Sequence, residues 1–178
     1  MNQTTPKSRS HLIEAYNQMM QSIRSAFDNA DAAEMTLQKA LDMARQQVIH
    51  LGEVSVEEAQ EISEFVKRDI NEAAEYMLET SSDFGDWLML DIEVLERKIV
   101  DMFLSVADRT RVELETLKQY NREISLYYSG EITGPGMLKC TQCGKCVAFL
   151  TTGHIEACEQ CGNGSFQRAD KRTDCKDD

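Results

Sequence analysis

The segment Cys140-Thr141-Gln142-Cys143-Gly144 is repeated as Cys158-Glu159-Gln160-Cys161-Gly162, with 14 residues between the two copies. Two residues between paired cysteines let one tight turn direct both sulfurs to a single point, and the glycine after each pair can take the left-handed conformation that such a turn requires. Zn²⁺ is held in sites of this kind by four thiolates arranged as a tetrahedron. We therefore expect the ligands to be Cys140, Cys143, Cys158 and Cys161.

Four thiolates around one Zn²⁺ leave no open position for a water or a substrate, and catalytic zinc sites keep such a position. We therefore expect one structural Zn²⁺ per chain. A disulfide-reductase site would place a single Cys-x-x-Cys at the start of a helix in a βαβ unit, and the sequence shows no such unit. With only three histidines and no recognisable nucleophile–base pair, the sequence favours a protein that is not an enzyme.

Two further cysteines complicate this assignment. Cys143-Gly144-Lys145-Cys146 is also a Cys-x-x-Cys, but it lacks the following glycine and would leave Cys140 unused. Cys146 is then a small apolar strand residue, or a spare thiol for ligand exchange or redox sensing. Cys175 lies in a charged tail and is expected to be a free, exposed thiol. His154 is expected on the surface of a hairpin, with replacement of a cysteine ligand as the alternative.

The residues between and after the two cysteine pairs have the composition of short strands. Residues 147–151 and 154–157 flank Thr152-Gly153 and predict a hairpin, and residues 165–168 predict a third strand. Two cysteine turns and a small sheet make a zinc ribbon. Because its core is so small, metal binding and folding should be one event.

Charge and cysteine content divide the 178-residue chain in two. Residues 1–136 hold 13 basic and 25 acidic residues, a net charge of −12, whereas residues 137–178 hold six of each and all six cysteines. Three glycines and one proline within residues 129–136 mark the boundary. We predict an acidic helical domain (10–128), a Gly/Pro linker (129–136), a zinc ribbon (137–169) and a charged tail (170–178).

Apolar residues recur with helical spacing through the first part of the chain. They predict helices over residues 10–51, with a break near Asn29–Asp31 or none, and from Ser55 to Thr80, where Ser55 and Glu58 form a capping box. The same spacing runs from Phe84 to Tyr127, and one helix of that length would need a partner along all of it. The expected fold is mainly α: an elongated helical hairpin or bundle of coiled-coil type, followed by a small C-terminal β zinc ribbon. The long helices could also pair between two copies of the chain to form a homodimer.

Composition also bears on location and partners. No apolar run approaches the ~20 residues of a membrane span, and the first ten residues lack the apolar region of a secretory signal, so we expect a cytoplasmic protein that does not bind membranes. The acidic surplus is expected to form a solvated surface, with an interaction face for a basic partner as the alternative. Nucleic-acid binding is disfavoured by this charge, although five basic residues of the second part could contact phosphates: Lys139, Lys145, Arg168, Lys171 and Arg172.

Several segments carry a resemblance to a known family. The run Tyr127-Tyr128-Ser129-Gly130-Glu131-Ile132-Thr133-Gly134-Pro135-Gly136 precedes the first Cys-x-x-Cys-Gly, and Gly153-His154-Ile155 and Phe166-Gln167-Arg168 flank the second. Together with residues 73–76 and 105–110, these resemble the YbeL-like family of bacterial zinc-ribbon-containing proteins. The resemblance spans about residues 16–168 and implies a cytoplasmic protein with bound zinc and no assigned reaction. Cys146 and Cys175 lie outside the family pattern.

These observations favour a cytosolic zinc-binding protein that mediates contacts with an unidentified protein partner. Two alternatives stay open at this point. One is a nucleic-acid-binding ribbon associated with transcription or the ribosome, and the other is a metal or redox sensor that uses the thiols of Cys146 and Cys175.

Overall fold

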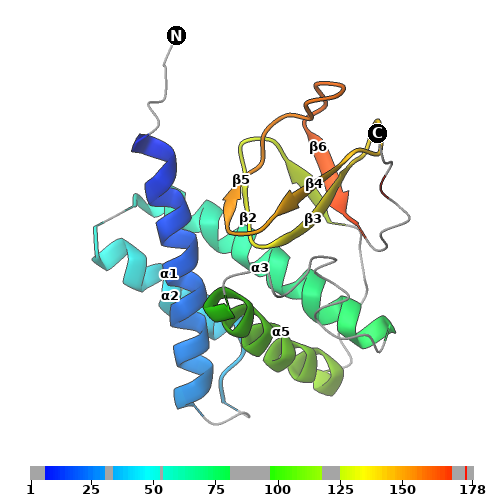
Figure 1. The fold of residues 1–178 in the computed structure, drawn as a ribbon. Coiled ribbons are helices and arrows are strands. Elements are labelled where there is room, and N and C mark those ends of the chain that lie inside the picture. Colours follow the sequence, from blue (N-terminus) through cyan, green and yellow to red (C-terminus); the bar gives the residue numbers. More distant parts are fainter. Residues whose placement is uncertain are drawn as a thin grey trace.

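The computed structural model describes residues 7–30, 34–52, 54–80, 97–117, 125–169 and 175. Its helices are α1 (Lys7–Asn29), α2 (Leu37–His50), α3 (Val56–Thr80) and α5 (Arg97–Leu117). Its strands are β1 (Leu126–Tyr128), β2 (Ile132–Thr133), β3 (Gly136–Cys140), β4 (Cys146–Phe149), β5 (Gly153–His154) and β6 (Ser165–Arg168). The small sheet lies on the helical layer, over α3 (Figure 1). The expectation of a mainly helical chain with a small C-terminal β region is confirmed.

The helix ends follow the local chemistry of the sequence. The first predicted helical segment is interrupted, because α1 ends at Asn29. The next helix, α2, begins at Leu37, and Thr36 caps its N-terminus by accepting a hydrogen bond from the backbone N–H of Lys39. At the start of α3 the predicted capping box is confirmed. The N–H of Glu58 donates to Ser55 Oγ at 3.1 Å, and the N–H of Ser55 donates to the Glu58 carboxylate at 2.8 Å.

The long helix predicted for residues 84–127 is wrong at its C-terminal end. Residues 97–117 are helical, but Leu126–Tyr128 form β1, and residues 84–96 and 118–124 lie outside the described part of the chain. The helical spacing misled here because Tyr127 lies in a strand that pairs with β6, and its ring is buried there against Arg68 of α3 and Arg168. The coiled-coil arrangement is not seen among the described helices, since α1 packs against each of α2, α3 and α5.

The ribbon contains two antiparallel sheets, one of order β1-β6-β3-β4 and one that pairs β2 with β5. The third strand predicted at residues 165–168 is confirmed as β6, and it lies between β1 and β3. The predicted hairpin between residues 147–151 and 154–157 is wrong. β4 pairs with β3, and β5 pairs with β2, because the chain preceding the first cysteine pair supplies both partners.

Most of the segment predicted as a linker, residues 132–136, is buried where the ribbon meets the helices. Ile132, Thr133, Gly134 and Pro135 are buried, and Ile132 belongs to the same apolar cluster as the helical core. The sheet already begins at Leu126, ahead of the predicted boundary. The Gly/Pro segment therefore attaches the ribbon to the helices.

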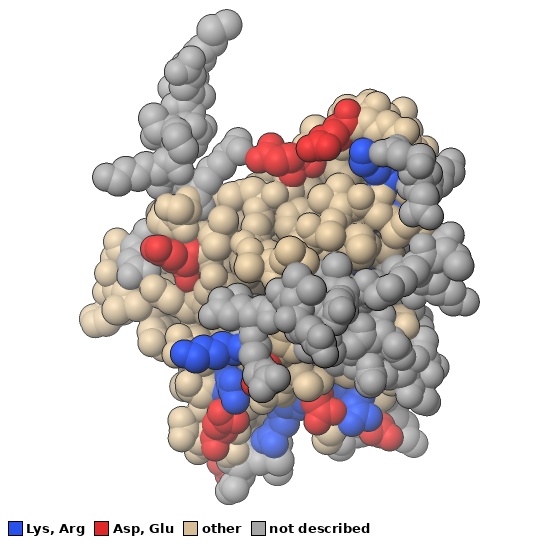
Figure 2. Space-filling model, in the orientation of Figure 1, with Lys and Arg blue, Asp and Glu red and all other residues tan. Residues whose placement is uncertain are grey.

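The described surface carries both signs of charge. Acidic and basic side chains lie side by side over the helices in the lower half of Figure 2, and on this face those described form no continuous acidic patch. No described helix is both long enough and apolar enough to cross a membrane.

Candidate metal centre

The four cysteines of the two repeated segments converge at the end of the ribbon. Their sulfur atoms all lie within 4.8 Å of one another, and Sγ–Sγ distances are 3.6 Å for Cys140–Cys161 and 3.6 Å for Cys143–Cys158. Each short contact joins one cysteine from each copy of the repeat. The two copies are therefore folded face to face, and their sulfurs enclose one point.

The two cysteine turns have the same backbone form. The N–H of Gly144 donates to the carbonyl oxygen of Cys140 at 3.0 Å, and the N–H of Gly162 donates to that of Cys158 at 2.7 Å. Both glycines have positive φ, 80° and 73°, as the sequence pattern predicts. These turns point backbone N–H groups at the sulfurs, which stabilises negative charge there.

Asn163 supports the cluster from outside it, and the sequence analysis did not find it. Its Nδ2 donates to Cys140 Sγ at 3.4 Å, to Thr141 Oγ1 at 3.1 Å and to the carbonyl oxygen of Ser165 at 2.8 Å. A single amide thus joins the turn of the second cysteine pair to the first. The only sequence signal was an asparagine directly after the second Cys-x-x-Cys-Gly.

The sulfurs differ in their affinity for protons. Burial opposes ionisation of Cys140, but the N–H groups of Cys143 and Gln142 and the Asn163 amide outweigh it and lower the pKa of Cys140 to about 6. The N–H of Cys161 lowers the pKa of Cys158. For Cys161 the N–H of Asn163 favours ionisation, but burial and the three neighbouring sulfurs raise its pKa to about 12. The cluster thus holds protons that a bound cation would displace.

The dimensions of the cluster fit Zn²⁺. A tetrahedron with metal–sulfur bonds of ~2.3 Å has edges of about 3.8 Å, close to the two short sulfur–sulfur distances. Cys140 and Cys158 are buried and Cys143 and Cys161 half-buried, so the site is largely shielded from water. Four tetrahedrally placed thiolates are a donor set that proteins use for zinc and for iron–sulfur centres.

The remaining cysteines lie apart from this group. Cys146, at the start of β4, forms a disulfide with Cys175, so the prediction of a free Cys175 thiol is wrong. Cys175 is thereby held beside β4, which sequence spacing alone could not reveal. His154 lies in β5 and is not part of the sulfur cluster.

A buried polar network joins the ribbon to the helices, centred on Asp69 of α3. One of its carboxylate oxygens accepts hydrogen bonds from Tyr16 Oη at 2.7 Å, the N–H of Gly134 at 2.8 Å and Thr133 Oγ1 at 3.2 Å. The other lies 3.7 Å from the Arg168 guanidinium. Asp69 is 0% exposed. Sequence analysis did not identify it, since it is one acidic residue among many on the helices.

Arg68 and Arg168 complete this network around one aromatic ring. Their guanidinium carbons lie 3.8 Å and 5.1 Å from the centre of the Tyr127 ring. Arg68 also pairs with Glu131 and donates to the carbonyl oxygen of Ile132 at 3.1 Å. The suggestion that Arg168 contacts phosphates is wrong, because its side chain is buried and donates to Pro135 and Thr133.

Comparison with known proteins shows which family the chain is similar to. A family model described as a zinc-ribbon containing domain matches residues 24–170, which include the helices as well as the ribbon. The proteins named "Uncharacterized protein YbeL" from Escherichia coli K12 and Escherichia coli O157:H7 are each 26% identical over 157 residues, 88% of this chain and 95% of the relative. No solved structure matches significantly.

Proposed function

The chain belongs to the zinc-ribbon containing domain family, and on that basis we propose that it is a non-enzymatic cytoplasmic protein whose structural zinc ribbon mediates contacts with another protein. The observation that carries the proposal is the set of four cysteine sulfurs within 4.8 Å. Cys140, Cys143, Cys158 and Cys161 would hold one Zn²⁺ per chain. The bound ion would cross-link the two cysteine turns and so stabilise the ribbon, whose own apolar core is small.

The arrangement of the ligands supports a structural role for the metal. Four thiolates saturate a tetrahedral Zn²⁺, so no position stays open for a substrate or an activated water. The ribbon is fixed to α3 through Asp69 and Arg68. A rigid, metal-stabilised surface held at one orientation suits recognition of a partner protein.

Metal content and coordination test the first half of the proposal. Elemental analysis of the purified full-length chain should give one zinc per chain, with Cys161→Ser losing it and Cys146→Ser retaining it. With Co²⁺ in place of zinc, added azide should leave the visible spectrum unchanged, because a closed site has no position for it. Sub-stoichiometric metal, or a spectrum that azide alters, would contradict a structural site.

Partner capture tests the second half. The zinc-loaded chain and the Cys140→Ser/Cys161→Ser chain are used as paired baits in a bacterial extract. A protein retained reproducibly by the first and lost with the second supports recognition by the ribbon. Failure to retain any protein in repeated trials would count against the interaction role and leave the zinc assignment intact.

The disulfide between Cys146 and Cys175 favours a second candidate, a thiol-based redox sensor. Its formation removes two electrons and two protons from the thiols, which a peroxide would accept as it is reduced to water. Peroxide should then protect both residues from alkylation without releasing zinc. Alkylation of Cys146 and Cys175 at the same rate before and after peroxide would remove this candidate.

A further inference from the structure

The six cysteines supply two cross-links, and the ends of these cross-links alternate along the chain. The expected zinc ligands form one pair at residues 140–143 and a second pair at residues 158–161. The disulfide joins Cys146, which lies between the two pairs, to Cys175, which lies after both. A bound ion would close the loop between the pairs, and the disulfide closes a loop of 29 positions that contains the second pair. Each cross-link therefore restrains part of the loop that the other closes.

The disulfide also connects the two strands that flank a ligand strand. Cys146 begins β4 and pairs with Lys139 of β3, next to the ligand Cys140. On its other side β3 pairs with β6, where Cys140 lies opposite Phe166. Cys175 follows β6 in the chain and is bonded to the start of β4. The bond therefore links both neighbours of the strand that carries Cys140.

The apolar core of the ribbon is too small to hold this arrangement without a cross-link. Its cluster of buried described residues has six members, and two of them are the ligands Cys140 and Cys158. In a lobe of this kind the measured free energy of metal binding includes the cost of folding. A covalent bond that restricts the metal-free chain lowers this cost, while the bonds between metal and sulfur stay the same.

We propose that the Cys146–Cys175 disulfide raises the zinc affinity of the ribbon, so that the oxidised chain holds the ion more tightly than the reduced chain. This inference rests on the proposed zinc ligands and adds a means of regulating them. Oxidation breaks two S–H bonds and forms one S–S bond, which removes two electrons and two protons from the thiols. Hydrogen peroxide accepts them as its O–O bond breaks, and two molecules of water are produced.

The length of the loop sets the expected size of the effect. In the chain-entropy description, a cross-link over 29 positions shifts the folding equilibrium by roughly 400-fold. The hydrogen bond from the N–H of Gly134 to Asp69 uses no metal ligand and also restrains the ribbon. We therefore expect a smaller gain, of about 10- to 100-fold in zinc affinity. Because such coupling is reciprocal, zinc should favour the disulfide over the two thiols by the same factor.

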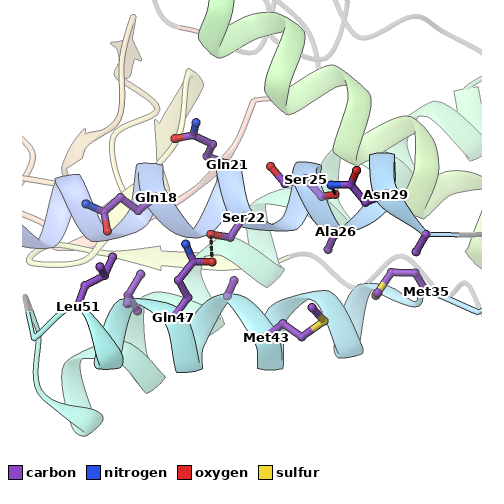
Figure 3. Close-up of a pocket in the computed structure, with 13 residues that line it drawn as sticks. Gln18, Gln21, Ser22, Ser25, Ala26, Asn29, Met35, Met43, Gln47 and Leu51 are labelled. Atoms are coloured by element: carbon purple, nitrogen blue, oxygen red, sulfur yellow. Dashed lines mark hydrogen bonds between the residues drawn. The ribbon is translucent and has the colours of Figure 1, made fainter.

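Methionines are the other side chains that peroxide oxidises, and they occur on the helices. Met35 and Met43 lie in the open groove between α1 and α2, where Ser22 donates a hydrogen bond to Gln47 Oε1 at 3.0 Å (Figure 3). Met43 is 54% exposed. Since all six cysteines lie in residues 137–178, a variant that lacks one cysteine of the disulfide keeps every methionine and separates the two reactions.

Zinc affinity, measured by competition with a chromophoric chelator before and after treatment with peroxide, tests the proposal. Peroxide is added to the zinc-loaded full-length chain, in which the ion protects the ligand thiols, and peptide mapping identifies the Cys146–Cys175 bond. The oxidised wild type should bind zinc at least about tenfold more tightly than the reduced wild type. Cys175→Ser should have the affinity of the reduced wild type both with and without peroxide.

The possible failures distinguish this inference from the zinc assignment. If oxidised and reduced wild type each bind one zinc with equal affinity, or if oxidation weakens binding, the inference is overturned and the zinc site stands. The inference is also overturned if the Cys146–Cys175 bond does not form, or if peroxide tightens binding equally in Cys175→Ser. If neither form of the wild type binds zinc, the proposed zinc site fails, and the inference fails with it.

Discussion

The carboxylate of Asp69, in the middle of α3, accepts a hydrogen bond from the backbone N–H of Gly134 at 2.8 Å, across 65 positions of sequence. Thr133 Oγ1 and Tyr16 Oη donate to the same carboxylate oxygen. Three donors on one oxygen and Arg168 near the other compensate the cost of burying this charge. The segment that looked like a linker is therefore held to α3 by a specific ionic anchor.

Asp69→Asn should destabilise the protein strongly. The substitution keeps the size of the side chain but removes the buried negative charge that lies 3.4 Å from the guanidinium of Arg68 and 3.7 Å from that of Arg168. Breaking a buried ion pair in this way costs about 3–5 kcal/mol of unfolding free energy. Urea denaturation followed by circular dichroism measures the free energy of unfolding.

Asp108→Asn is the matched control: it breaks the exposed Asp108–Arg111 pair and should lower the free energy of unfolding by less than about 1 kcal/mol. Equal losses for the two variants would refute the role of Asp69.

Gly136→Ala should destabilise the junction between ribbon and helices. A Cβ at this position would overlap Nη1 of the buried Arg168 side chain, and φ is +140°, which L side chains rarely adopt. Arg168 would have to leave Asp69, so we expect a loss of at least about 2 kcal/mol in unfolding free energy. Gly52→Ala is the control, because φ is also positive there, at +74°, but no atom lies within 4 Å. Gly52→Ala should lower the free energy of unfolding by only about 1–2 kcal/mol, through backbone strain. If Gly136→Ala lowered it by no more than Gly52→Ala does, the close packing of Arg168 against Gly136 would be contradicted.

Local signals in the sequence account for the elements that were predicted well. The Ser55–Glu58 capping box and the glycine after each cysteine pair depend on neighbouring residues, and both occur in the structure. The repeated cysteine spacing identified four residues whose sulfur atoms lie close together in the structure. Each of these features is decided by chemistry within a few positions of the chain.

Features that depend on distant residues were missed. Leu126–Tyr128 have helical spacing but pair with β6, about 40 positions later, because Tyr127 is buried between the sheet and two arginines. The pairing of β4 with β3 and the disulfide of Cys146 with Cys175 likewise depend on tertiary arrangement. One sequence cannot reveal which of its 31 acidic residues becomes the buried anchor at Asp69.

Asn163→Ala should weaken zinc binding without abolishing it. The Asn163 amide donates to Cys140 Sγ and joins the two cysteine turns, and loss of such an outer hydrogen bond costs about 10–100-fold in metal affinity. Competition with a chromophoric chelator measures the affinity. Gln142→Ala is the control, since the Gln142 side chain is exposed and its backbone N–H, which acts on Cys140, is retained. An unchanged affinity for Asn163→Ala would show that the amide does not support the site.

The buried tyrosines should make the protein sensitive to alkali. Burial, together with the charge of Asp69, raises the pKa of Tyr16, and burial raises the pKa of Tyr127. Because the folded state holds these protons more tightly than the unfolded state, their contribution to stability is complete below about pH 10 and is lost as the pH rises above it. The unfolding free energy should therefore decline above about pH 10, and the decline should be smaller in Tyr16→Phe.

Tyrosinate absorbance separates this effect from general alkaline damage. At about pH 11, while circular dichroism still reports a folded chain, Tyr16→Phe and Tyr127→Phe should show the same tyrosinate signal as wild type, because burial raises the pKa of both hydroxyls above the ordinary tyrosine range. If Tyr16→Phe lowered the signal, the Tyr16 hydroxyl would be ionising in the folded protein, and its place as a donor to Asp69 would be refuted.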